Sequence, residues 1–179
     1  MNIDGAHFEV LMSELDSACR ELVEAAERDP GLWDRRKPGK WTAGQHVEHV
    51  AISMAAMAGP LEARGHAPVS ESPARPGRGL LESLWIALVV KRGSLPRGGK
   101  TRAEFGPTAL PDRAATLERL GGESDRIRAL GSRLSAEDRD RAWIANPFMP
   151  RWHYTLPEVV RVNAVHARHH AKLIREIDP

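Results

Sequence analysis

The sequence predicts an all-α protein, an up-down four-helix bundle with one additional helix, in which residues 1–179 form a single domain. Apolar residues recur at intervals of three and four along most of the chain, which is the period of a helix that buries one face, and no segment alternates as a half-buried strand does. The hydrophobic fraction of 41% and the charged fraction of 28% are ordinary for a globular protein. A chain of 179 residues is long enough to bury a sizeable core.

The first two helices have clear boundary signals. The first is predicted over about 7–28, where the apolar period holds until Asp29-Pro30-Gly31 ends it. The second begins after Thr42, because Thr42 followed three residues later by Gln45 is a capping-box pattern. Gly59-Pro60 is expected to weaken or stop this helix.

Three further helices complete the prediction. A third covers about 80–92, and a fourth covers about 112–134. The segment 94–110 between them is too rich in glycine and proline for regular structure, and loops of this length are often functional lids. Thr155 and Glu158 form a second capping-box pattern, which starts the last helix. We expect the first, second, third and last helices to share one core, with the fourth packed alongside.

Composition and charge exclude several classes of protein. The sequence pI is about 9.0, but a formal net charge of +2 is too small for strong attraction to nucleic acid. The longest wholly apolar run, 84–90, is too short to cross a bilayer, and the first residues do not resemble a secretory signal. Cys19 is the only cysteine, which excludes an internal disulfide and a cysteine-rich zinc site and suits a reducing compartment. We therefore expect a cytoplasmic protein whose partner is a small molecule and neither a nucleic acid nor a membrane.

Basic residues gather in the glycine- and proline-rich middle of the chain. They belong either to a solvated loop or to a patch that receives an anionic ligand. These residues are Arg75, Arg78, Lys91, Arg92, Arg97, Lys100 and Arg102.

The last helix, predicted to run to about Ile177, carries two histidines on its core-facing stripe. At about 100° per residue, His166 and His170 fall on one face, one turn apart, whereas His169 lies at the edge of that stripe. Two imidazoles at this spacing can share a metal ion, as in the HExxH helix of zinc peptidases. The alternative is a pair of hydrogen-bonded core histidines.

The second helix supplies a candidate third ligand. His49 shares a face with Gln45 and Ile52, and His46 is displaced to one side of that face. A third imidazole from this helix would complete a three-histidine site with open positions for water or substrate. The alternative interpretation is a surface pair, His46 and His49, on either side of Glu48.

Two blocks of sequence surround these histidines: KPGKWTAGQHVEHV and YTLPEVVRVNAVHARHHAKLI. Both resemble the DinB-like helical bundles, a family that includes the YfiT-type metal hydrolases and the bacillithiol and mycothiol S-transferases. The family's first metal-binding histidine stands eight residues after the tryptophan of the first block, which is His49 here. Its HxxxH is followed four residues later by Ile, which gives His166 and His170. His46 and His169 lie outside the matched pattern and are the substitutes if the alignment is shifted.

The resemblance implies a divalent ion, Zn, Ni, Fe or Mn, held by His49, His166 and His170. It also implies a thiol-dependent S-transferase, in which a low-molecular-weight thiol is activated as the nucleophile, and a homodimer. A metal-dependent hydrolase that activates water and a metal-binding module without turnover are the alternatives. Glu48 points away from His49, and this shortage of nearby carboxylates favours thiol activation over water activation. Leu173 stands where family members often carry Gln. This departure from the family pattern affects the residues expected to hydrogen-bond to the metal ligands.

The tryptophans and loops suggest how the site is enclosed. Trp41 is expected to pack as an anchor against the first turn of its helix, and Trp152 is the better candidate for stacking on a ligand. The linker before Trp41 or the loop NPFMPRWHY is expected to line the entrance, with the 94–110 loop as a lid.

The remaining candidate side chains have simpler interpretations. Cys19 is predicted to be a small buried hydrophobe. The other histidines are expected at the surface, and His153 has the alternative of overhanging the metal site: His7, His66 and His153.

Overall fold

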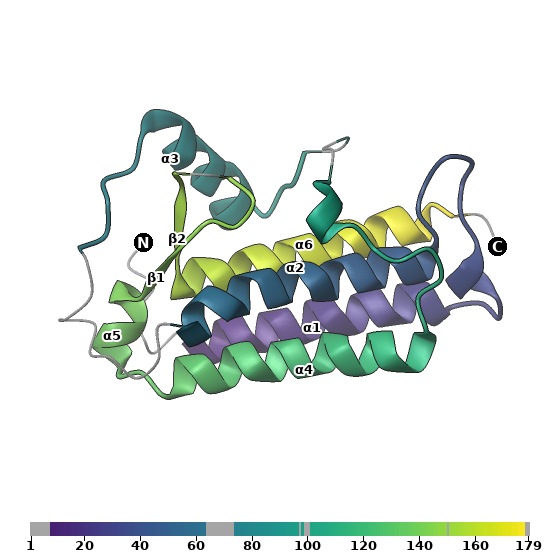
Figure 1. Ribbon diagram of the computed structural model, residues 1–179, viewed down its shortest axis with the longest axis horizontal. Coiled ribbons are helices and arrows are strands. Elements are labelled where there is room, and N and C mark those ends of the chain that lie inside the picture. The colour runs from purple at the N-terminus through teal and green to yellow at the C-terminus, as the bar shows by residue number, and fades with distance from the viewer. Residues whose placement is uncertain (1–7, 64–73, 97, 99–100, 150, 178–179) are drawn as a thin grey trace.

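Four long helices, α1, α2, α4 and α6, lie side by side along the long axis of the computed structural model (Figure 1). The structure describes residues 8–63, 74–96, 98, 101–149 and 151–177. It is mostly helical, which confirms the predicted all-α bundle. The elements in chain order are α1 (Phe8–Glu27), the short helix η2 (Leu32–Asp34), α2 (Ala43–Ala63), α3 (Leu80–Ile86), the π-helical η4 (Ala87–Lys91), η5 (Ala103–Phe105), α4 (Arg113–Ser132), α5 (Ala136–Arg141), β1 (Trp143–Ala145), β2 (His153–Thr155) and α6 (Leu156–Arg175).

Ion pairs show the relative directions of the four helices. Arg168 of α6 lies 3.1 Å from Glu21 of α1, and both residues are in the second half of their helices, so α1 and α6 run parallel. Arg126 of α4 pairs with Glu62 at the end of α2, so these two helices also run parallel. The two pairs run in opposite directions (Figure 1). The start of α2 therefore meets the end of α6.

The third predicted helix joins the core only through its second half, so the prediction that it shares the core as a full member of the bundle was correct only in part. α4 packs in the bundle against α1 and α2, whereas α3 lies to one side, near the two strands (Figure 1). Leu80 and Leu81 of α3 are 76% and 72% exposed. Contact with α6 is made by η4, which buries Val89 and Val90.

The helices α2 and α6 begin where the two predicted capping boxes indicate. The Thr42 backbone N–H donates to Gln45 Oε1 at 2.9 Å, and the Gln45 N–H donates to Thr42 Oγ1 at 3.1 Å. The second capping box, before α6, is formed in the same way. The expected stop at Gly59-Pro60 was wrong, because α2 continues to Ala63. Pro60 falls in the last turn, where it removes only one hydrogen bond of a helix that is about to end.

Two strands and one short helix were not predicted from the sequence. β1 and β2 pair antiparallel with Trp143 opposite Thr155, and each has three residues, too few for an alternating pattern to emerge. α5 has six residues and is capped by the Ser135 side chain.

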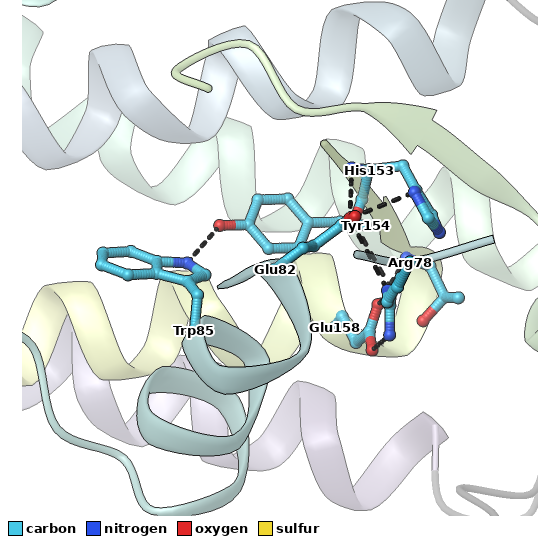
Figure 2. A network of polar contacts seen from close by, with 7 residues as sticks. Arg78, Glu82, Trp85, His153, Tyr154 and Glu158 are labelled. Carbon is cyan, nitrogen blue, oxygen red and sulfur yellow. Dashed lines mark hydrogen bonds and ion pairs between the residues drawn. The ribbon is translucent and has the colours of Figure 1, made fainter. Parts of the chain in front are cut away.

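A buried polar network attaches α3 to the strands and to α6 (Figure 2). Arg78 Nη1 donates to Glu158 at 2.8 Å, and Glu82 accepts the His153 backbone N–H at 2.8 Å. The His153 ring also lies 3.1 Å from Glu82 and is only 2% exposed. His153 is therefore neither at the surface nor over the metal site, and both predictions for it were wrong. Sequence reasoning missed this network because its partners lie on elements far apart in the chain.

The remaining single-residue predictions have mixed outcomes. Cys19 is buried, as predicted, and burial, with a smaller effect of Asp16, raises the pKa of its thiol to about 12. His7 and His66 lie outside the described residues. In the described part of the chain, none of the helices combines the length and the hydropathy needed to cross a membrane.

Two glycines of α4 should respond in opposite ways to alanine substitution. A Cβ at Gly131 would collide with the Phe8 ring, whereas one at Gly121 meets nothing within 4 Å. Gly131→Ala is expected to lower the free energy of unfolding by about 1–3 kcal/mol through overpacking. Gly121→Ala should raise it by about 0.5–1 kcal/mol, because alanine loses less backbone entropy in a helix. Urea denaturation measures both, and equal effects of the two variants would contradict the packing of α1 on α4.

Candidate metal centre

Three histidines from two antiparallel helices meet inside the bundle. His49 comes from the second turn of α2, and His166 and His170 come from the second half of α6. One ring nitrogen from each lies within 4.8 Å of the other two. These are the three residues that the sequence motifs singled out, and the geometry is that of a group able to hold a metal ion.

The α6 pair has nitrogen positions that suit a shared ion. His166 Nε2 and His170 Nε2 lie 3.0 Å apart. Two ligand nitrogens on one tetrahedral zinc ion, each about 2.0–2.1 Å from the metal, are about 3.3 Å apart. The pair therefore needs only a small adjustment to bind the same ion.

The orientation of His49 is set by a backbone carbonyl. Its Nδ1 lies 2.7 Å from the Phe105 carbonyl oxygen in η5. A carbonyl can only accept, so Nδ1 carries the proton and Nε2 keeps its lone pair. A hydrogen bond of this kind on the second ring nitrogen is the usual support of a metal-binding histidine.

His46 supports the cluster from outside it. Its Nδ1 lies 2.7 Å from His170 Nδ1. When His170 offers Nε2 to a metal, its proton sits on Nδ1 and His46 Nδ1 accepts it. His169 is also outside the group of three, with its ring centroid 5.4 Å from that of His170. His46 and His169, the two substitute ligands, are thus neighbours of the cluster but are not members of the group of three.

Trp41 lies against the cluster, whereas Trp152, the sequence's candidate for stacking on a ligand, does not. The Trp41 ring centroid is 4.8 Å from that of His49, and its plane is 19° from that of His170 at 6.2 Å. Trp152 instead packs on Trp85, with ring centroids 6.1 Å apart. The apolar face of Trp41 limits the access of water to the rings beneath it.

The segment after η5 is held against the start of α2. The Thr108 N–H donates to Glu48 Oε2 at 2.6 Å, and Gln45 Nε2 donates to the Thr108 carbonyl at 2.9 Å. Part of the 94–110 loop therefore lies beside the cluster, and its role as a lid stays a prediction. Phe148 of the NPFMPRWHY loop packs on Phe105 with centroids 4.7 Å apart. Glu48 is buried and bonded to Thr108, so it neither flanks a surface pair nor joins the histidines.

The imidazoles are kept neutral by their surroundings. Burial, followed by the proximity of His49 and His169, lowers the pKa of His46 to about 4. Burial and the neighbouring rings lower the pKa values of His166 and His170 well below 6.5. Burial also lowers the pKa of His49, against a smaller opposite effect of the Phe105 carbonyl. Neutral imidazoles are the form that binds a metal.

A family model for the DinB superfamily matches residues 12–174. The chain belongs to the DinB superfamily. The matched range of this DinB chain extends from α1 into α6, and it includes all three clustered histidines. A search of the curated proteins and a search of the solved structures find no match.

The contact between His46 and His170 should strengthen metal binding. His46→Ala removes the acceptor for His170 Nδ1–H, and outer hydrogen bonds of this kind contribute about 10- to 100-fold to metal affinity. His46→Asn keeps an acceptor oxygen and should restore most of that loss. Competition with a chromophoric chelator measures the affinity, and circular dichroism checks that both variants are folded. An unchanged metal affinity in His46→Ala would show that His46 does not support the metal ligands.

The metal-free protein should lose stability in mild acid. Because the folded-state pKa values of these histidines lie below the value of about 6.5 in the unfolded chain, the unfolded state binds more protons as the pH falls. The free energy of unfolding should therefore be constant above pH 7 and fall by at least about 2 kcal/mol between pH 7 and pH 5. Urea denaturation at each pH tests this, with His46→Gln, which removes one titrating ring, as the matched control with a shallower slope. A flat profile would mean that the rings are solvated.

Proposed function

We propose that this DinB protein is a metal-dependent enzyme that transfers a small thiol to an electrophilic substrate. A divalent ion, drawn from Zn, Ni, Fe and Mn, would be held by His49, His166 and His170. When bound, such an ion supplies Lewis acidity that lowers the pKa of a thiol or of water. The three-imidazole arrangement supports this proposal because neutral ligands leave the positive charge of the ion uncompensated.

The lack of a carboxylate in the histidine cluster, among the described residues, is the observation that supports a thiol over water. Among the described residues, the grouped metal-binding side chains are three histidines without a carboxylate. The adjacent Glu48 is bonded through both oxygens to Thr108. Hydrolysis by an activated water needs a base in reach of that water. A thiol needs less help, because its pKa of about 8.5 is already close to neutral.

The protein's own residues would bind and shield the reactants. His46 and the Phe105 carbonyl hold the rings of His170 and His49, so that two nitrogens face the same point. Trp41 keeps water away from one side. In the transfer itself, the thiol sulfur forms a bond to an electrophilic carbon, the leaving group departs with its bonding electrons, and the thiol proton passes to solvent.

Removal of one ligand should abolish metal binding and turnover together. His170→Ala is expected to lose the ion, because two imidazoles bind a divalent metal far more weakly than three. Metal analysis of the purified protein gives the stoichiometry, and a screen of thiols with electrophilic substrates gives the turnover. His169→Ala, the neighbouring substitution outside the cluster, should keep the metal.

The outcomes separate the alternatives. Turnover that depends on metal but not on a thiol would indicate a hydrolase. Full metal binding without turnover for any thiol would indicate a binding module. Thiol-dependent turnover in metal-free protein would contradict the proposed site.

A further inference from the structure

A cavity of about 470 Å³ lies between α6 and the segment that follows η4. The turn that follows η4 forms one wall, and α6 forms the other. Four of the lining side chains are cationic: Arg92, Arg161, Arg168 and Lys172. A concave site with several positive charges favours an anionic ligand over a neutral one.

Only part of this positive charge is neutralised within the protein. Arg161 pairs with Glu14, and Arg168 Nε pairs with Glu21 at 3.1 Å, both from α1. Across the described ranges of the chain, no carboxylate pairs with Arg92 or Lys172. The cavity therefore keeps an excess of two positive charges, which matches a dianion.

The guanidinium groups are held in place yet keep donors to spare. Arg161 Nε donates to the Val90 carbonyl at 3.2 Å, which holds its side chain beside the wall formed by η4. Glu21 contacts only Nε of Arg168, and this leaves its two Nη groups available as a fork. Forked donors of this kind recognise a carboxylate or a phosphate through two parallel hydrogen bonds.

The cavity lies on a different side of α6 from the clustered histidines. At about 100° per residue, His166 and His170 fall about 100° or more around the helix from Arg161, Arg168 and Lys172, and neither histidine lines the cavity. His169 lies between the two sides: it lines the cavity, and its ring is 5.4 Å, centroid to centroid, from the ring of His170. The cavity is therefore a site separate from the metal cluster.

We propose that this cavity binds a small anion that carries carboxylate or phosphate groups with about two negative charges. The proposal rests on the lining of the cavity and is independent of the metal centre. Of the basic residues gathered in the middle of the sequence, Arg92 is the one that lines this cavity. Arg78 is instead bonded to Glu158, and Arg97 and Lys100 lie outside the described residues.

Calorimetric titration with succinate, inorganic phosphate and neutral succinamide tests the anion site. The two dianions should bind to the full chain at low ionic strength, and succinamide should not. The double variant Arg92→Gln/Lys172→Gln should weaken dianion binding by about tenfold or more, since each charge-assisted hydrogen bond contributes about that factor. Succinate and phosphate together separate the two anion chemistries, and the tighter of them identifies the preferred group.

A matched control distinguishes a site from general surface charge. Lys91→Gln/Arg175→Gln removes the same two charges from exposed positions next to, but outside, the cavity lining. It should leave dianion affinity within about twofold of the wild type, because Lys91 and Arg175 do not line the cavity and cannot donate hydrogen bonds to an anion inside it. Equal losses in the two double variants, or no dianion binding in the wild type, would overturn the proposal.

The anion site is tested separately from the metal centre. Succinate binding to His170→Ala should persist, because no clustered histidine lines the cavity. Loss of succinate binding in a folded His170→Ala variant would contradict a separate anion site.

Discussion

Imidazole rings that are buried side by side must remain uncharged, because a proton on any of them would place a positive charge where little solvent can stabilise it. His46, His49, His166 and His170 meet this condition where the start of α2 crosses the end of α6. Their hydrogen bonds fix where the ring protons lie: His49 Nδ1–H donates to the Phe105 carbonyl, and one proton lies between Nδ1 of His46 and Nδ1 of His170. The lone pairs that remain point toward one another. The packing of these two helices thus produces a group of metal ligands.

The same contacts tie the start of α2 to the segment that covers the cluster. Gln45 accepts the Thr42 N–H as part of the capping box, and its amide group donates to the carbonyls of Thr108 and Ala109. The side chain that begins the helix also holds the segment that follows Phe105, whose carbonyl orients His49. A substitution at Gln45 would consequently disturb the helix start and the ligand orientation together.

The three clustered histidines could be predicted from sequence for two reasons. Helical periodicity determines which residues share a face, and the spacing of the family motifs distinguished His49, His166 and His170 from the neighbouring histidines. The role of His46 could not, because its partner is 124 residues away. The placement of α4 was missed for a related reason: its buried stripe includes Thr116, Ser124 and Gly131, which carry no hydrophobic signal. The apolar run of the third helix is the stronger pattern, yet only part of it is buried: Ile86, Val89 and Val90 face the core, whereas Leu84 and Leu88 are exposed. Homodimerisation and the cytoplasmic location stay predictions.

The central claim is that three imidazoles hold one divalent ion and leave part of its coordination open. X-ray absorption spectroscopy of the zinc- or cobalt-loaded protein measures this directly, because imidazole rings give a characteristic scattering beyond the first ligand atoms. The account predicts three imidazoles at about 2.0–2.1 Å, with the remaining positions taken by exchangeable ligands such as water or an added thiol. A spectrum with fewer than three imidazoles, or with a coordination sphere closed by protein ligands, would contradict it.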